Sequence, residues 1–579
     1  MEVTQANFKA TLPEIETAIK NCTFVSIDTE LTGLKTSLNK INAFDTPKQY
    51  YEKVIKDCRQ FLVVQYGLTF FRYDEAADVF KHKSYNFYIF RKPVRNCVTD
   101  QRFLCQTSCI DFLIKNGFDF NKLFKDGISY LNNVEEDMYK NSIEETEKRI
   151  RESSNKSSGI SIPAEHQDFV DSVVKELQDF LASEENEKEL PKCNAFLRLL
   201  IYQVAKEKFQ DQISLETRVV GKDRILFAKK YKSQIERMEI DEKKIEDMQN
   251  SMNDYIGFSK VIRMIIESEK LVVGHNVMLD LLHTIHKFVT PLPEDYDDFK
   301  ECASSLFPKI VDTKHISSSE SFKDLVNSTV LAQLLETLQK EPFEMPKIEV
   351  EENSLSYNIN DAKEHEAGYD SFITGVALLG LWKYLGIEKG SFHNDDIFAN
   401  LEFLKPYLNK IFLMYLSDNQ YAHLSGPDLN PSREHVFYLT FPKEWTPNTI
   451  VQLFSPFGGV YIAWLSEASA FVALHKKDQA AVALKTLSQG DTYSIMTFAK
   501  RQALLAGLRT IAPSPIKRRK SIEGSLQTKR RKTNSFDGGS FSSSKRSIEP
   551  IVEEEQQTDQ GASGSPSKQG LFEVASNWD

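Results

Sequence analysis

The chain has 579 residues, a length that allows three or four domains, and 41% of them are hydrophobic, which is ample for packed cores. No N-terminal signal peptide is expected, and the longest apolar helical run, residues 372–381, is too short to span a bilayer. We therefore predict a soluble protein with no membrane partner. Seven cysteines, an odd number without C-x-x-C spacing, argue against a disulfide framework and against a zinc site.

The net charge of −11 is distributed unevenly along the chain. Residues 501–548 hold twelve Lys/Arg and two Asp/Glu, a net charge of +10, which leaves −21 on the remainder. Because general attraction to phosphates cannot hold RNA on an acidic body, any RNA binding there must use local grooves, bound metal and base stacking.

The first candidate site lies at residues 24–31, an apolar run that ends at two carboxylates. Asp28 and Glu30 are two residues apart, so on a strand both project from the same face. Carboxylates held side by side repel unless a cation lies between them, and a hard divalent ion such as Mg²⁺ is the natural occupant. The alternative, a turn cap at Asp28 and a solvated charge at Glu30, is commoner for an isolated pair, so other acids must converge here.

The next segments predict a mixed sheet followed by a small insert. Residues 61–71 and 85–90 are rich in β-branched and aromatic side chains, separated by the polar stretch 73–84, which predicts an antiparallel pair beside the first strand. Residues 144–159 and 231–254 are charged, without apolar periodicity, and are predicted to be linkers. Between them, helices at 169–181 and 196–205 and a strand pair over 213–227 predict an α+β unit.

Two further acids follow. Residues 271–274 predict a buried strand, and residues 277–286 a helix that Asn276 could cap. Asp280 lies in the first turn of this helix, where a carboxylate also suits the helix dipole. On one continuous helix His365 and Asp370 would lie about 140° apart, at roughly 100° per residue. For both to face one site, His365 must lie just before the helix and Asp370 inside it.

The C-terminal part begins with a segment that resembles an RNA-recognition motif: a strand at 434–441, a helix at 451–457, and strands at 460–464 and 470–474. Ser469 and Leu474 occupy positions where stacking aromatic residues are usual, which weakens the case for single-strand binding on the sheet. After Gln489 the composition drifts to Ser, Gly, Gln and charged residues, which predicts a disordered tail.

Three motifs carry a resemblance to a known family. D-x-E-x-T-G-L from Asp28, G-H-N-x-x-x-D ending at Asp280, and H-x-A-G-x-D ending at Asp370 resemble, in this order, the motifs of the DEDDh exonucleases. The sequence resembles the poly(A)-specific ribonuclease (PARN) family in particular, at residues 44–47, 108–112, 118–122 and 571–574.

The resemblance implies a ribonuclease-H-like α/β nuclease domain with a mixed sheet, formed by residues 1–143 and 250–427. The insert at 161–230 resembles a nucleic-acid-binding domain named for an Arg-x-x-x-His pair, but Tyr202 stands where the histidine is expected after Arg198. Contact with RNA by this pair is therefore left open. A ferredoxin-like, RRM-type cap-binding domain at 433–500 and a disordered basic, Ser-rich tail at 505–579 complete the expected order.

The activity implied by the resemblance is 3′-to-5′ exoribonuclease action that shortens the poly(A) tails of mRNA and of maturing non-coding RNAs and releases 5′-AMP. It would take part in mRNA turnover, including nonsense-mediated decay. Two Mg²⁺ ions, or Mn²⁺, would be held by four carboxylates, with His365 as the base that takes a proton from the attacking water. The four ligands would be Asp28, Glu30, Asp280 and Asp370.

The family also implies contacts with substrate. Lys314, just beyond a short β-strand at 310–312, would contact the poly(A) RNA. The alternative explanation is that Lys314 is an ordinary surface lysine. The residues expected near the terminal base are Leu31, Leu34, Ile110, Phe112 and His365, and for the apolar ones ordinary core packing is nearly as good an explanation. Trp464 would stack on the 7-methylguanosine of a 5′ cap, and its alternative is a core aromatic residue.

Family members act as homodimers, so a homodimer is implied. The basic clusters within 517–532 resemble a two-part nuclear import signal, read by an import receptor, and the alternative is a nonspecific RNA-binding arm. Nuclear, nucleolar and cytoplasmic localisation is expected. Two other functions remain open: 3′ trimming of small-RNA precursors, and noncatalytic RNA binding on a nuclease scaffold.

Overall fold

The computed structural model describes residues 1–35, 40–94, 101–152, 162–209, 212–221, 223–231, 234–352, 354, 356–361, 363–399 and 401–511. The chain divides into two compact units, Met1–Phe498 and Ala499–Asp579. The basic clusters of 517–532 and most of the predicted disordered tail lie outside the described residues, so those predictions stay predictions. No described helix is long and apolar enough to cross a membrane.

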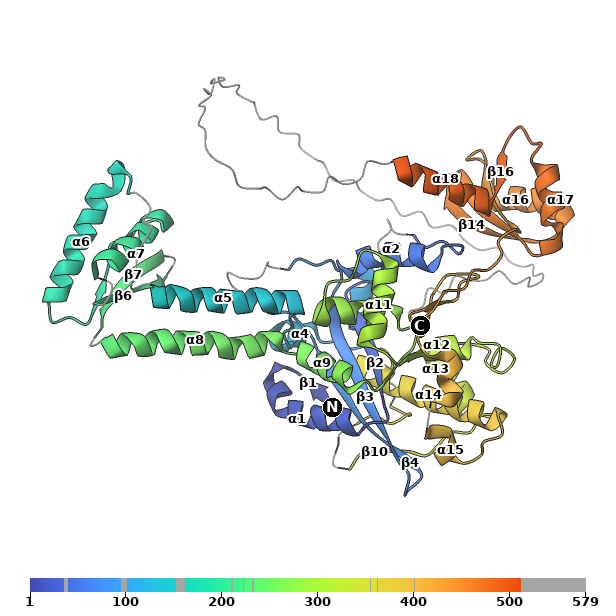
Figure 1. Cartoon of the computed structure of the whole chain (residues 1–579), viewed down its shortest axis with the longest axis horizontal. Helices are drawn as coiled ribbons and strands as arrows, with labels where there is room; N and C mark the ends of the chain where they lie inside the picture. Colours follow the sequence, from blue (N-terminus) through green and yellow to red (C-terminus); the bar gives the residue numbers. More distant parts are fainter. Residues whose placement is uncertain are drawn as a thin grey trace, which may run out of the picture. The chain divides into compact units, whose positions relative to one another are not determined.

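A seven-stranded mixed sheet forms the centre of the nuclease fold (Figure 1). Its order is β1-β4-β3-β2-β8-β9, and β10 also pairs with β4. Strand β2 is antiparallel to β3 and parallel to β8, as expected for a strand between a hairpin and a crossover. The strands are β1 (Glu2–Val3), β2 (Phe24–Leu31), β3 (Val63–Asp74), β4 (Val79–Tyr88), β8 (Leu271–Gly274), β9 (Ile310–Asp312) and β10 (Ile348–Val350).

Helices cover both faces of this sheet, which gives a three-layer α/β architecture (Figure 1). One core forms against α1 (Gln5–Asn21), α2 (Pro47–Cys58), α9 (Ser259–Ser268), α10 (Met278–Thr284) and α11 (Tyr296–Leu306). The other forms against α12 (Thr313–Ser317), α13 (Leu331–Leu338), α14 (Ala367–Glu388) and α15 (Asn394–Phe398). Helix α14 is apolar all round because it lies between the sheet and α13, so nearly all of its residues are buried.

The predicted antiparallel pair is confirmed, but both strands extend into the polar stretch at 73–84, so only residues 75–78 separate them. Strand β3 runs to Asp74, β4 starts at Val79, and the two pair in register from Gln65↔Tyr88 to Asp74↔Val79. Polar residues are tolerated here for two reasons. Tyr73 and Asp74, near the turn, are only partly buried, while the buried His82 and Ser84 are hydrogen-bonded to Ser356 and Thr69.

In the two predicted linkers, residues 144–152 and 234–254 are helical, contrary to the prediction. Helix α5 (Asn133–Glu152) and helix α8 (Gln234–Ile256) lie side by side (Figure 1). Their contact includes a narrow apolar stripe, with Tyr139 and Ile143 facing Met248 and Met252. Such a stripe is easily overlooked, since charged and other polar residues fill most of the positions between its apolar members.

The insert is the predicted α+β unit. It holds α6 (Gln167–Ala182), α7 (Ala195–Phe209) and a three-stranded sheet in the order β5-β7-β6. The strands are β5 (Glu187–Glu189), β6 (Ile213–Val220) and β7 (Asp223–Lys230). The two helices and the sheet share one core, so this unit has a hydrophobic centre of its own.

The C-terminal sheet has the order β14-β15-β13-β16, with α16 (Pro447–Phe454) and α17 (Ala480–Leu487) on one face. This is the arrangement expected of an RRM-type domain, so the predicted fold class is confirmed. Its strands are β13 (Val436–Thr440), β14 (Val460–Ser466), β15 (Ser469–Leu474) and β16 (Ser494–Thr497). The predicted tail begins too early, because β16 and the helix α18 (Phe498–Ile511) follow Gln489.

Candidate active site

Three of the predicted acids meet where β2 approaches the N-terminus of α14. One carboxylate oxygen from each of Asp28, Glu30 and Asp370 lies within 4.8 Å of the others. Glu30 is only 7% exposed, and the other two are half-buried. Three carboxylates this close repel one another, and a donor set made only of carboxylate oxygens fits a hard divalent cation such as Mg²⁺ or Mn²⁺.

Side chains from the neighbouring strands hold the N-terminus of α14 at this place. Gln65 of β3 accepts the backbone N–H of Ala367 at 2.9 Å, and Asn86 of β4 accepts that of Gly368 at 3.1 Å. These bonds satisfy N–H groups that a helix N-terminus leaves without a partner. Gly67, paired with Asp28, permits the approach, since a Cβ there would lie 1.7 Å from the Ala367 carbonyl oxygen. None of these three residues was singled out from the sequence; a glycine inside a strand pattern was the available signal.

His365 lies just before α14 and Asp370 inside it, as predicted. The backbone of His365 is left-handed, with φ of 69°, and its N–H donates to Asp370 Oδ2 at 2.9 Å. Its ring packs edge-on against Phe112 of α3 (Thr107–Lys115), with centroids 4.6 Å apart. The turn and Phe112 together set the direction of the imidazole.

Asp280, the third residue of α10, is held by a contact of its own. Thr29, which lies between Asp28 and Glu30 on β2, donates its hydroxyl to Asp280 Oδ1 at 2.5 Å. Burial raises the pKa of Asp280 to about 6, against the opposing hydrogen bond from Thr29. A carboxylate whose charge is disfavoured in this way gains from a nearby cation. The cap of α10 was predicted wrongly: the N-cap is Val277, and Asn276 has a left-handed backbone with φ of 57°.

The structure also places the predicted substrate contacts. Leu31 is a core residue at 3% exposure, which favours ordinary packing there, while Leu34 and Ile110 are partly buried. Lys314 is 6% exposed at the start of α12, with its ammonium 5.9 Å from the centre of the Phe412 ring. It is therefore not a freely exposed surface lysine.

The RRM-type sheet is covered on the face that lacks helices. Phe44, from the segment between β2 and α2, packs edge-on against Tyr461 and Phe471 at 6.0 Å. Arg433 bonds the carbonyl oxygen of Phe44 at 2.6 Å, and its guanidinium lies 4.7 Å from the Phe498 ring. The face on which RRM-type domains usually stack single strands is thus covered by Phe44.

Trp464 lies on the helix-bearing face of the same sheet, at its rim. It is 41% exposed, and its ring stands perpendicular to Phe441 at 5.4 Å. Phe441 in turn stacks on Trp445 at 5.7 Å. Leu474 also faces the helices, so it was not the position of a missing stacking residue.

In the insert, Arg198 has a structural role. Its guanidinium donates to the carbonyl oxygens of Cys193 at 2.6 Å and Arg224 at 3.1 Å. Tyr202, in place of the expected histidine, bonds Thr217 at 3.0 Å. Both side chains of the pair are therefore engaged within the insert.

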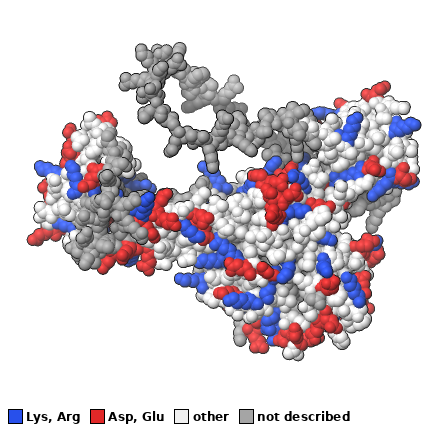
Figure 2. Space-filling model, in the orientation of Figure 1, with Lys and Arg blue, Asp and Glu red and all other residues white. Residues whose placement is uncertain are grey.

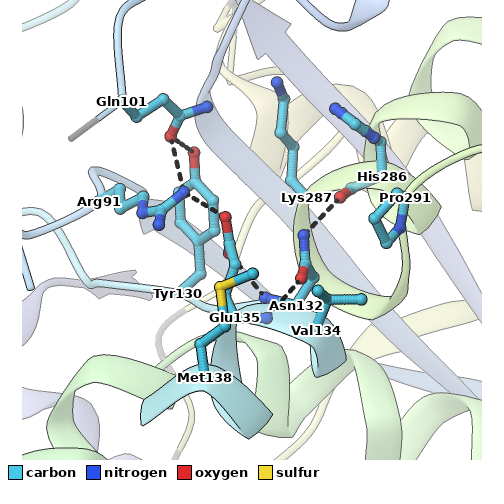
Figure 3. Close-up of a pocket in the computed structure, with 10 residues that line it drawn as sticks. All are labelled: Arg91, Gln101, Tyr130, Asn132, Val134, Glu135, Met138, His286, Lys287 and Pro291. Carbon is cyan, nitrogen blue, oxygen red and sulfur yellow. Dashed lines mark hydrogen bonds and ion pairs between the residues drawn. The ribbon is translucent and has the colours of Figure 1, made fainter. Parts of the chain in front are cut away.

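A cavity of about 270 Å³ lies apart from these residues, between α5 and the segment that follows α10 (Figure 3). Arg91 bridges Gln101 and Glu135 on one side of it, and Asn132 bonds the His286 carbonyl on the other. None of the predicted site residues lines it. On the face drawn in Figure 2, the described acidic and basic side chains are interspersed, without a continuous basic surface.

The fold and the acidic cluster together are those of a nuclease with a candidate site for divalent cations, and the chain belongs to the CAF1 family of ribonucleases, whose sequence model matches residues 3–378. A second model, an RNA binding domain, matches residues 426–504.

Among individual proteins, the chain is similar to "Poly(A)-specific ribonuclease PARN" of Xenopus laevis, with 38% identity over 583 residues that cover 96% of this chain and 91% of that protein. It is 39% identical to the human PARN over 515 residues, 86% of this chain and 80% of the relative. "Poly(A)-specific ribonuclease PNLDC1" of Mus musculus is 30% identical over 489 residues, 79% of this chain and 85% of the relative.

Proposed function

We propose that this ribonuclease removes adenylates one at a time from the 3′ end of poly(A) and releases 5′-AMP. The observation that carries the proposal is the meeting of the Asp28, Glu30 and Asp370 carboxylates within 4.8 Å of one another, beside the His365 turn. The preference for adenine is supported by the names of the PARN relatives.

Asp28, Glu30, Asp280 and Asp370 would hold two divalent cations. When bound, these supply Lewis acidity at the scissile phosphate and lower the pKa of a water molecule. His365 takes the proton from the attacking water, since its ring is directed by Phe112 and its backbone is fixed to Asp370. The water oxygen bonds to phosphorus, and the bond from phosphorus to the 3′ oxygen of the preceding nucleotide breaks. That oxygen takes a proton from solvent to become the new 3′ hydroxyl, and 5′-AMP leaves.

Lys314 contributes positive charge to the substrate path in this proposal. Its ammonium is fixed near Phe412, so it meets a phosphate with little loss of side-chain entropy. Leu34, Ile110 and Phe112 remain proposed contacts for the terminal nucleotide.

The test uses the purified protein and RNAs with or without a 5′ cap, ending in runs of A, U or C. In Mg²⁺ we expect stepwise loss of 3′ adenylates with 5′-AMP as product, slower loss of U or C, and no loss in EDTA. Equal rates on all three ends would instead favour a trimming nuclease without adenine preference. RNA binding without hydrolysis would favour the noncatalytic scaffold.

We propose further that Trp464 binds the 5′ cap. Since Phe44 covers the other face of the sheet, an exposed indole at the rim is the accessible aromatic surface for a cationic base. Cation–π attraction of an indole for such a base is worth roughly 0.5–2 kcal/mol. Phe441 stands perpendicular to the indole, and the exposed 41% of Trp464 is the part that a ligand could reach.

Trp464→Ala is expected to weaken binding of a cap analogue by about tenfold, equivalent to about 1.4 kcal/mol. It should also remove any stimulation of deadenylation by a cap and leave the rate on uncapped RNA unchanged. Tryptophan fluorescence titrated with cap analogue measures the first effect. Tyr461→Ala is the matched control, because Tyr461 is an exposed aromatic on the same strand but faces the opposite side. Undiminished quenching in the Trp464→Ala protein would place the cap elsewhere.

We also propose a homodimer and nuclear import through residues 517–532. Exposed apolar side chains near α3 and α5 support self-association, among them Ile114 and Met138, at 58% and 47% exposure. Sedimentation equilibrium tests the first proposal. Deletion of residues 513–535 tests the second, with loss of nuclear accumulation and intact hydrolysis of short oligoadenylate expected.

A further inference from the structure

Asp312, the last residue of β9, is completely buried and has an unusual number of backbone partners. Its Oδ1 accepts the N–H groups of Asn276 at 2.8 Å and Lys314 at 3.0 Å. Its Oδ2 accepts those of Val277 at 3.1 Å and Phe412 at 3.0 Å. One of these bonds, to Lys314, is the ordinary cap of α12, and the other three reach different parts of the chain.

Each tethered segment leads to a residue of the proposed site. Asn276 and Val277 immediately precede α10, whose third residue is Asp280. Lys314 is tethered at its own amide, and Phe412 of β11 (Lys410–Phe412) supplies the ring beneath the Lys314 ammonium. Asn276 has a left-handed backbone, which asparagine adopts more readily than most residues, and its N–H is bound to Asp312 within this turn.

We infer that Asp312 is a positioning residue, which holds the proposed metal ligand Asp280 and the proposed RNA contact Lys314 in one fixed arrangement. It does so by binding the backbone before α10, at the start of α12 and in β11 to the end of a central strand. The inference rests on the proposed function, since it adds a second layer to the same site.

Aspartate is the side chain that this role requires. A carboxylate accepts hydrogen bonds at both oxygens, and bonds to a charged acceptor are about twice as strong as neutral ones. Asparagine keeps the volume but turns an NH₂ group toward two backbone N–H groups. Asp312→Asn therefore frees one of the two pairs of donors without opening a cavity.

Magnesium affinity, measured by calorimetry without substrate, is the decisive quantity. Asp312→Asn should bind Mg²⁺ roughly 10-fold more weakly, as is typical when a group that orients a metal ligand is lost. Oligoadenylate hydrolysis should need more Mg²⁺ and show a raised KM, with kcat largely restored at saturating Mg²⁺, because Asp280 is displaced and not removed.

Asn409→Ala is the matched control. Asn409 bonds the backbone of Ile310 and Pro308 and the side chain of Ser425, so it joins the same strand to the β11 region without touching the segments before α10 or α12. This variant should lower the unfolding temperature and leave Mg²⁺ affinity unchanged.

Wild-type Mg²⁺ affinity in Asp312→Asn, or an equal loss in Asn409→Ala, would overturn the inference. If Asp312→Asn does not fold, Asp312→Ser, which keeps one acceptor oxygen, is judged by the same criterion. Failure of the wild type to bind Mg²⁺ would instead contradict the proposed function, so the two failures are distinguishable.

Discussion

Asp280→Asn is expected to lower oligoadenylate hydrolysis below about one hundredth of the wild-type rate, a loss of at least about 2.7 kcal/mol of transition-state stabilisation. The reason is the loss of one ligand charge from the proposed metal site, where divalent cations would stabilise the leaving oxygen and the nucleophile. Single-turnover assays at several Mg²⁺ concentrations measure the effect. Unlike Asp312→Asn, this variant should not recover at high Mg²⁺.

The fold should survive this change. Because the pKa of Asp280 is raised to about 6 in the folded protein, the stability linked to this group is present at low pH and lost as the pH rises through 6. At pH 7 the charged carboxylate therefore opposes folding of the metal-free protein, and a neutral amide removes that cost. We expect the unfolding temperature in EDTA to be equal to or above that of the wild type.

Asp298→Asn is the matched control for Asp280→Asn. Asp298 is the third residue of α11, as Asp280 is of α10, but it lies on an exposed surface. It should keep full activity. If Asp280→Asn keeps more than one hundredth of the wild-type activity, the proposal that Asp280 helps to hold two divalent cations is wrong.

His365→Ala should lower kcat by roughly 10²–10⁴, the usual contribution of a general base, and leave affinity for oligoadenylate within a few fold. The backbone N–H that binds Asp370 is retained in alanine, and both residues carry a Cβ, so the left-handed turn costs about the same. The acids should therefore stay in place while the proton acceptor is lost. Binding is measured in Ca²⁺ or with a non-hydrolysable 3′ end, and kcat in Mg²⁺.

His393→Ala serves as the comparison. His393 likewise immediately precedes a helix, α15, and makes no side-chain cap bond there. A parallel loss of RNA affinity and kcat in His365→Ala would identify a substrate contact and not a base.

Much of the nuclease fold could be predicted because its signals are local. The apolar run ending at Asp28 gives a strand wherever it lies, and the spacing of His365 and Asp370 requires the helix to begin between them, as it does at Ala367. The mixed sheet could be predicted because two segments rich in β-branched and aromatic residues, typical of a hairpin, accompany a short buried strand. These features depend on residues close together in the sequence.

The parts that could not be predicted depend on distant partners. Helices α5 and α8 look like linkers until each supplies the apolar stripe for the other. In the sequence, Gln65 and Asn86 are ordinary polar residues of strands. Their role depends on the N-terminus of α14, which is far along the chain and packs over Gly67. The covered face of the RRM-type sheet follows the same rule, since Phe44 comes from the nuclease part.

The contact of Phe44 with Phe471 would couple the two proposed binding activities, for the cap and for an adenylate end, thermodynamically. Phe44 lies in the sequence between β2, which carries Asp28 and Glu30, and α2, while Phe471 lies in the sheet that bears Trp464. A ligand of the nuclease part that binds more tightly when Phe44 contacts Phe471 also favours this contact for a ligand of the RRM-type domain. The factor by which a cap changes affinity for an adenylate end must then equal the factor by which an adenylate end changes affinity for the cap. Phe44→Ala should bring both factors toward one together, and measuring either reports the other.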